Sequence, residues 1–160
     1  MELLIVRHAT AEVQTASQQD SERTLTEDGR GQAERAGVKL VERNLVPELI
    51  LASPYVRAQE TAQIISKVCS GVEVITAPWA ASGMKSEDAL QQLRDYKEFA
   101  SVAIVGHEPD LSSLVCHLMG ARSWAVEVNP ATAALVGLNA SLTAGALRAL
   151  MQTPISYARS

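Results

Sequence analysis

The apolar run at residues 3–6 (LLIV) most constrains what this chain can fold into, because it leads directly into the basic pair Arg7-His8. A short, continuous apolar run is typical of a strand that is buried on both faces of a parallel sheet. Open α/β sheets bind their ligands just beyond the carboxyl ends of such strands. We therefore expect Arg7 and His8 to stand at a ligand site, although the pair alone is equally consistent with a basic surface where a strand ends.

The same alternation continues along the chain. Apolar runs predict further strands at 49–52, 72–76 and 101–105, and helical spacing predicts helices at 26–43, 55–68, 87–99 and 109–119. Loops are predicted at 11–24, 77–86 and 121–130, and two more strands at 132–138 and 146–152. This order predicts an α/β fold: a single domain, residues 1–160, with three α/β/α layers and a mostly parallel, mixed central sheet.

Three of the predicted strand ends carry basic or imidazole side chains. Arg7-His8, Arg57 and His107 each follow an apolar run. A doubly wound sheet places such ends side by side, so we expect these side chains to converge. Phosphate is the group that suits two guanidinium groups, because arginine donates paired hydrogen bonds to its oxygens and stays charged. Near neutral pH an imidazole serves as an acid, a base or a nucleophile.

Composition excludes several classes of function. The net charge is −4 and aromatic residues make up 4% of the chain, so we expect no nucleic-acid partner. No glycine-rich phosphate loop and no metal-ligand spacing occurs in the sequence, so neither a metal nor another cofactor is expected. Cys69 and Cys116 are expected to be buried free thiols, which is typical of a reducing compartment. With no targeting signal or membrane span in the sequence, we expect no membrane contact and a cytoplasmic location.

Four ordered blocks of the sequence resemble the histidine phosphatase superfamily, the phosphoglycerate-mutase-like group. The blocks are Arg7-His8-Ala9, Leu25-Thr26 with Gly29, Ser53-Pro54 with Arg57-Ala58 and Thr61, and Gly106-His107 ahead of Pro109. The resemblance covers the chain up to Met119, and the remainder matches only as predicted strands. The short length, the Arg23-x-Leu25-Thr26 element and the His-x-Pro form at 107–109 are most similar to the SixA-type phosphohistidine phosphatases.

The resemblance implies a role for each matched residue. His8 would be the nucleophile and would carry a phosphohistidine intermediate that water then hydrolyses. Arg7 and Arg57 would hold the phosphoryl oxygens, and His107 would hydrogen-bond the transferred group, with no metal required. Arg23 lies in a matched block and is a candidate substrate-binding residue, although an arginine of a polar loop is as readily plain surface charge.

Two features qualify the match. Ala9 stands where the signature has glycine, which is tolerable if the local φ is negative but strained if the site needs the left-handed region. Relatives that cleave phosphomonoesters place a carboxylate general acid after the third strand. The candidates here, Glu87 and Asp88, fall in the first turn of a predicted helix, where the helix dipole favours acids for structural reasons alone.

The resemblance favours a phosphatase that hydrolyses phosphohistidine on a protein, such as a phosphorelay phosphotransfer domain. An imidazole leaving group departs without strong acid help, which fits a weak acid position. Two alternatives stay open. One is the same chemistry on a small phosphorylated metabolite, a sugar phosphate or a nucleotide. The other is a phosphate-binding regulatory module without turnover, which Ala9 in the signature keeps possible.

Overall fold

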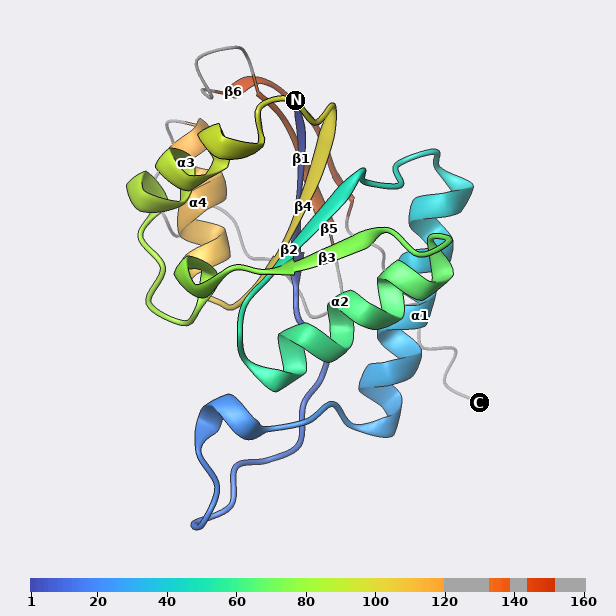
Figure 1. Ribbon diagram of the computed structural model, residues 1–160, viewed down its shortest axis with the longest axis vertical. Coiled ribbons are helices and arrows are strands. Elements are labelled where there is room, and N and C mark those ends of the chain that lie inside the picture. The colour runs from blue at the N-terminus through green and yellow to red at the C-terminus, as the bar shows by residue number, and fades with distance from the viewer. Residues whose placement is uncertain (120–132, 139–143, 152–160) are drawn as a thin grey trace.

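A twisted sheet forms the centre of the protein in the computed structural model, which describes residues 1–119, 133–138 and 144–151 (Figure 1). Its described strands are β1 (Glu2–Arg7), β2 (Leu49–Ala52), β3 (Glu73–Thr76), β4 (Ser101–Gly106), β5 (Ala133–Leu138) and β6 (Ala144–Met151). The strand order is β3-β2-β4-β1-β5-β6. The first four strands in chain order pair in parallel, and β5 and β6 pair antiparallel, so the predicted mostly parallel, mixed sheet is confirmed.

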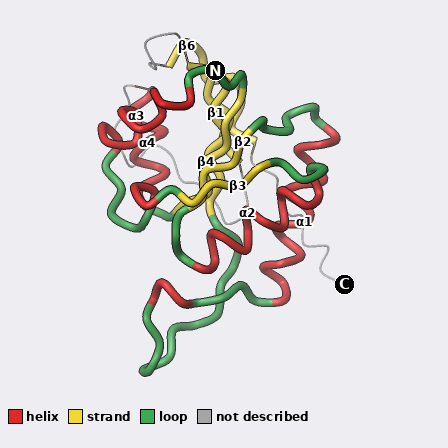
Figure 2. The backbone as a smooth tube through the Cα atoms, viewed as in Figure 1, coloured by secondary structure: helices red, strands yellow, loops and turns green. Residues whose placement is uncertain are grey.

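Helices cover both faces of the sheet and make it the middle of three layers (Figures 1 and 2). On one face α1 (Glu27–Glu42) packs beside α2 (Val56–Val68), and on the other α3 (Ser86–Leu93) packs beside α4 (Asp110–Met119). Successive side chains of a strand point to opposite faces, so Leu4 of β1 joins the core under α1 and α2, whereas Leu3 joins the core under α3 and α4. Both faces of β1 are therefore buried, which explains its uninterrupted apolar run.

The predicted helix at 87–99 is too long. The α-helix ends at Leu93, and a 3₁₀ turn, Arg94–Tyr96, follows it. Leu93, Tyr96 and Phe99 are spaced by three residues, a period that suits the three residues per turn of a 3₁₀ helix and keeps all three against the core. β6 begins two residues earlier than the predicted strand at 146–152, at Ala144. The predicted loop at 121–130 lies outside the described residues.

The β1–α1 loop, which we define as residues 8–26, extends beyond the carboxyl end of the sheet (Figure 2). A bridge between Ala11 and Leu25 closes its base. Thr26 caps α1, since its hydroxyl accepts a hydrogen bond from the Gly29 amide at 2.9 Å. A Cβ atom at Gly29 would lie 2.0 Å from the carbonyl oxygen of Thr10, so only glycine lets the first turn of α1 approach the loop this closely.

Cys69 and Cys116 are buried free thiols, as the sequence predicts. None of the helices in the described ranges is long and apolar enough to cross a bilayer.

Candidate active site

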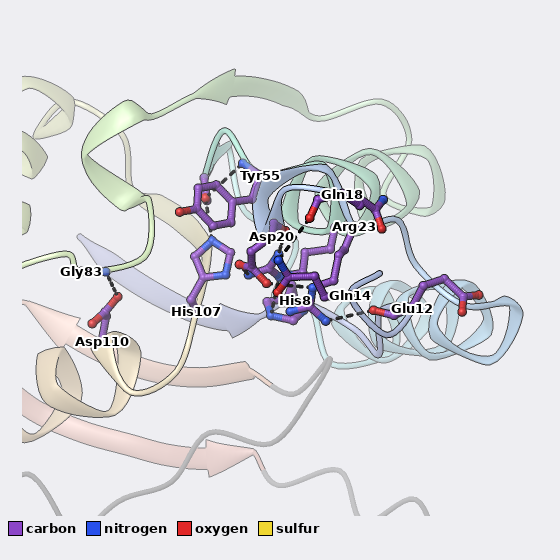
Figure 3. A network of polar contacts seen from close by, with 12 residues as sticks. His8, Glu12, Gln14, Gln18, Asp20, Arg23, Tyr55, Gly83, His107 and Asp110 are labelled. Carbon is purple, nitrogen blue, oxygen red and sulfur yellow. Dashed lines mark hydrogen bonds and ion pairs between the residues drawn. The ribbon is translucent and has the colours of Figure 1, made fainter. Parts of the chain in front are cut away.

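The carboxyl ends of three neighbouring strands lie together and bring distant parts of the sequence to one place. Arg7 at the end of β1 pairs with Gly106 at the end of β4, and the His8 amide donates to the Gly106 carbonyl at 3.0 Å. On the other side of β4, the Ser53 amide donates to the Val105 carbonyl at 2.9 Å. His8 and His107 consequently lie beside each other (Figure 3). Their ring centroids are 5.2 Å apart.

A cavity of about 340 Å³ opens at these strand ends. All five residues that the sequence singles out as site candidates line it: Arg7, His8, Arg23, Arg57 and His107. The other lining residues come from the β1–α1 loop, the loop before α3 and the start of the segment that leads to α4: Ala9, Thr10, Ala11, Ser82 and Glu108. The structure thus brings the predicted site residues together around a single cavity.

Hydrogen bonds define the tautomer of His8. Its Nδ1 lies 2.7 Å from the Ala9 carbonyl oxygen, which can only accept, so Nδ1 carries the proton. The opposite nitrogen, Nε2, therefore has a lone pair, and it accepts a hydrogen bond from Nε of Arg57 at 3.1 Å. Burial, together with the charges of Arg57 and Arg7, lowers the pKa of His8 to about 4. At neutral pH His8 is an uncharged imidazole whose Nε2 lone pair is a potential nucleophile.

His107 is held by its other nitrogen. Its Nε2 lies 2.7 Å from the hydroxyl oxygen of Ser53, which also accepts from the Tyr55 amide at 3.3 Å, and its ring packs against the Tyr55 ring at 4.7 Å. Nδ1 is buried and has no hydrogen-bond partner among the described residues. When Ser53 donates to Nε2, the ring proton sits on Nδ1. Burial, then the neighbouring His8 and Arg57, lower the pKa of His107 to about 3.

Arg57 lies in the first turn of α2, and only 5% of its side chain is exposed. It donates with Nη1 to the backbone carbonyl of Asp20 at 2.6 Å and with Nη2 to the Asp20 carboxylate at 2.9 Å, besides its bond to His8. Its guanidinium group also lies over the Tyr55 ring, 4.9 Å from the centroid. A nearly buried guanidinium therefore links the nucleophile candidate His8 to Asp20.

Arg23 reaches the cavity from the β1–α1 loop. Its Nε donates to the Asp20 carboxylate at 2.8 Å and its Nη1 to the Glu12 carbonyl at 2.9 Å. Partial burial by itself raises the pKa of Asp20, but the hydrogen bonds and charges of Arg57 and Arg23 outweigh it and hold that pKa below its usual range. Sequence reasoning missed Asp20, and the only signal for it was an acid three residues before Arg23.

The two carboxylates considered as general acids lie away from the cavity. Glu87 and Asp88 are both exposed on α3 and do not line the cavity, and the Glu87 carboxylate lies 3.5 Å from Nδ1 of His117. The carboxylate that does line the cavity is Glu108, directly after His107, and it accepts a hydrogen bond from the Ser112 hydroxyl at 2.6 Å. The sequence signal that could have identified Glu108 is its position next to His107, a predicted site residue.

Ala9 causes no backbone strain. Among the described residues, the non-glycine residues with positive φ are Asn44 and Ser70, so Ala9 does not occupy the left-handed region. Its amide donates to the Thr61 hydroxyl at 3.1 Å, and its side chain is fully buried against Leu25 and Ala33. The methyl group therefore fills a small apolar space beside the cavity without distorting it.

The cavity has the chemistry of an oxyanion site. Three arginines line it, while both imidazoles are neutral at pH 7, and Glu108 is the carboxylate in its wall. Such a set matches the charge and the several acceptor oxygens of a phosphoryl group. Within the described ranges, no group of three or more His, Cys, Asp or Glu side chains is arranged to hold a metal ion.

Comparisons with known proteins agree with this geometry. Residues 3–81 match the family model of the histidine phosphatase superfamily (branch 1). An uncharacterised protein of Picosynechococcus is 30% identical over 117 residues, which is 69% of this chain and 68% of that protein. Among solved structures, the protein histidine phosphatase SixA complexed with tungstate is 25% identical, with a TM-score of 0.77 over 89% of this chain and 92% of that one. The alpha-ribazole phosphatase of Shigella flexneri is 19% identical, with a TM-score of 0.75 over 93% and 96%.

Proposed function

Because the chain belongs to the histidine phosphatase superfamily, we propose that it is a phosphatase in which His8 is the nucleophile and phosphohistidine on a partner protein is the substrate. The observation that carries this proposal is the lone pair on Nε2 of His8. It faces a cavity lined by three arginines and by His107, whose Nδ1 is buried without a hydrogen-bond partner among the described residues. A neutral imidazole with a fixed tautomer, surrounded by phosphate-binding groups, is equipped for attack on phosphorus.

In the first step, Nε2 of His8 forms a bond to phosphorus while the bond from phosphorus to the substrate nitrogen breaks. The substrate nitrogen keeps the electron pair of that bond. The Nε–H of Arg57, which points at Nε2 in the free protein, moves to a phosphoryl oxygen, and the other arginines share the remaining oxygens. Nδ1 of His8 keeps its hydrogen bond to the Ala9 carbonyl, which stabilises the positive charge that develops on the ring.

In the second step, water attacks phosphorus and the bond to Nε2 breaks, so His8 regains its lone pair and inorganic phosphate is released. The proton of the water passes to the phosphate. Nδ1–H of His107 donates to a phosphoryl oxygen in both steps, which gives its buried nitrogen the partner that it lacks in the described structure. These roles use only side chains of this chain, and they assign Arg7, Arg23 and Arg57 to binding the phosphoryl oxygens.

Two observations favour a phosphohistidine substrate. Glu87 and Asp88 lie outside the cavity, so the acid position after β3 holds no carboxylate near His8, and Ser82 lines the cavity there instead. A departing imidazole that already carries a proton on its second nitrogen needs no acid. The similar SixA structure is that of a protein histidine phosphatase, which supports a phosphorylated protein as the partner. A phosphotransfer domain in the cytoplasm is the partner that we propose.

A small phosphomonoester is the second candidate, and Glu108 is the observation that favours it. Its carboxyl group lines the cavity and, when protonated, is placed to supply the proton that an alkoxide leaving group requires. The similar fold of an alpha-ribazole phosphatase is compatible with this alternative. A module without turnover has less support, since the unstrained backbone at Ala9 removes the sequence feature that favoured it.

The deciding experiment compares two substrates: a phosphotransfer domain labelled with ³²P on histidine, and a sugar phosphate. We expect rapid loss of label from the protein substrate, an acid-labile ³²P adduct on the enzyme, and slow release of phosphate from the ester. The His8→Asn variant is the control and should take up no label. Faster hydrolysis of the ester would assign the metabolite function, and no adduct with either substrate would leave only phosphate binding.

A further inference from the structure

Asp20 contacts two of the cavity arginines but does not itself line the cavity. One carboxylate oxygen accepts from Nη2 of Arg57 at 2.9 Å and the other from Nε of Arg23 at 2.8 Å. The backbone carbonyl of the same residue accepts from Nη1 of Arg57 at 2.6 Å. Asp20 is therefore joined to both guanidinium groups from outside the cavity wall.

These bonds leave the arginines able to bind a ligand. Each terminal nitrogen of a guanidinium carries two N–H groups, so Nη1 and Nη2 of Arg57 each have a second donor after bonding to Asp20. The contacts restrict the orientation of the guanidinium plane while its remaining donors stay available. Arginine carries a large side-chain entropy, and fixing its plane in advance reduces the entropy lost when phosphate binds.

Charge gives Asp20 a second effect. Arg7, Arg23 and Arg57 line the same cavity, so their positive charges repel one another. The Asp20 carboxylate lies between Arg57 and Arg23 and offsets that repulsion, so both side chains can stay near the cavity before any anion arrives. Its lowered pKa keeps it ionised at neutral pH.

Other bonds hold the β1–α1 loop besides those of the Asp20 carboxylate. The base of the loop is closed by the bridge from Ala11 to Leu25, and the Leu25 amide donates to the Glu60 carboxylate of α2 at 2.6 Å. Asp20 begins the short 3₁₀ helix Asp20–Glu22, in which the Gln19 amide donates to the Glu22 carboxylate at 3.1 Å. Removing the carboxylate of Asp20 should leave these bonds intact, so its role can be tested without unfolding the loop.

We propose that Asp20 is a positioning residue, which holds Arg57 and Arg23 in the arrangement that binds the phosphoryl group. The inference rests on the proposed function, because the phosphoryl group that the arginines bind is taken to be that of the substrate. In this role the β1–α1 loop is part of the site, because a residue 37 positions from Arg57 in the sequence determines where its guanidinium lies. Asp20 acts through the arginines and does not take part in bond making.

Oxyanion binding tests this proposal without requiring turnover. Isothermal titration with tungstate and with inorganic phosphate should give an affinity about tenfold or more weaker in Asp20→Ala, since a misplaced binding group can cost up to about 10²-fold. In an Arg57→Ala background the same substitution should cost less than about threefold, because most of what Asp20 positions is then absent. Glu12→Ala is the matched control: it removes a carboxylate from the same loop, and its exposed side chain lies outside the cavity wall.

The outcomes separate the possibilities. An equal loss in both backgrounds, or a loss that accompanies a lower melting temperature and recurs in Glu12→Ala, would mean that Asp20 only supports the fold. Unchanged tungstate binding in Asp20→Ala would mean that the carboxylate does not position the arginines, and tighter binding would mean that it competes with the anion; either result overturns the proposal. Asp20→Glu should recover part of the affinity if the carboxylate itself is what counts.

Activity with the labelled phosphotransfer domain distinguishes failure of this proposal from failure of the proposed function. In one outcome, the wild type binds tungstate, Asp20→Ala weakens this binding less in the Arg57→Ala background, and the wild type dephosphorylates neither substrate. This outcome supports the positioning role of Asp20 and contradicts the proposed phosphatase function. In another outcome, the wild type hydrolyses phosphohistidine and Asp20→Ala binds tungstate as tightly as the wild type. This outcome supports the proposed phosphatase function and contradicts the positioning role of Asp20. A wild-type protein that binds neither oxyanion overturns both.

Discussion

His8 and His107 follow neighbouring parallel strands, and their surroundings give them different chemistry. His8 donates with Nδ1 to the Ala9 carbonyl and presents the Nε2 lone pair, next to Arg57. His107 is bound to Ser53 through Nε2, and its Nδ1 is buried without a partner among the described residues. Burial lowers the pKa of both, so both are neutral at pH 7.

The hydrogen-bond partner of one ring nitrogen sets the role of the other nitrogen of the imidazole. A carbonyl can only accept, so it fixes the proton of His8 on Nδ1 and leaves Nε2 free to attack. A serine hydroxyl can donate, so it allows His107 to keep its proton on Nδ1. We accordingly assign attack to His8 and hydrogen-bond donation to His107, and the following predictions test that contrast.

Replacing each histidine in turn should give the largest difference. We expect His8→Ala to lose all acid-labile phosphoenzyme and to lower kcat by more than about 10⁴-fold, because the nucleophile is gone. His107→Ala should lower kcat by about 10²- to 10³-fold, the usual cost of one oxyanion donor, and should still take up label. Rapid-quench labelling measures both. Label that survives in His8→Ala and disappears in His107→Ala would reverse the two assignments.

The residues that follow the two histidines also differ: Ala9 follows His8, whereas Glu108, a carboxylate, follows His107. Glu108→Gln should slow hydrolysis of an alkyl phosphate by about 10²-fold and of phosphohistidine by less than about threefold, because only the alkoxide needs a proton. Steady-state kinetics on both substrates provide the measurement. Glu87→Gln, on exposed α3, is the control and should change neither rate.

The acid limb of the pH profile should report His8. Its pKa is lowered to about 4, so the neutral, nucleophilic form persists well below pH 6.5. This form is lost only as the pH falls through about 4. With an acid-stable aryl phosphate, kcat/KM should be level between pH 7 and 5 and should fall about tenfold per unit below about pH 4. Circular dichroism at each pH checks that the fold persists. A fall that begins near pH 6.5 would contradict the assigned state of His8.

Ser53→Ala should alter His107 and spare His8. Without the hydroxyl, Nε2 of His107 has no partner to hold its proton on Nδ1, so we expect kcat/KM to fall about tenfold, in line with the net worth of one hydrogen bond. Nitrogen-15 chemical shifts of the imidazoles identify the tautomers. The shifts of His8 should stay as in the wild type, and a change confined to His8 would refute the proposed division of roles.

Ala9→Gly should have the smallest effect on activity. Glycine accepts the conformation that Ala9 already has, so we expect the rate to stay within about threefold of wild type. The free energy of unfolding should fall by about 1–2 kcal/mol, because a buried methyl group is lost and the unfolded chain gains freedom. Urea denaturation measures this change. A large gain in activity would instead show that the alanine impairs the site.

The order of strands and helices could be predicted from the sequence, and so could the residues proposed for the site. Apolar runs of strand length and helical spacing predict the order of strands and helices, and Arg7, His8, Arg57 and His107 each stand at the carboxyl end of a predicted strand or just beyond it. These predictions succeed because periodicity and local turn chemistry are written in neighbouring residues. The predicted helix at 87–99 was wrong after Leu93, because a 3₁₀ helix, Arg94–Tyr96, follows the α-helix there.

Only the tertiary structure decided how those residues are used. It places Asp20 on Arg57, brings Glu108 into the cavity, leaves Glu87 at the surface, and selects the nitrogen that each histidine presents. None of these contacts follows from spacing along the chain, because each joins segments that meet through the order of the sheet or through the path of the β1–α1 loop. Residue type supplies the functional groups, and the fold determines the direction in which each one points.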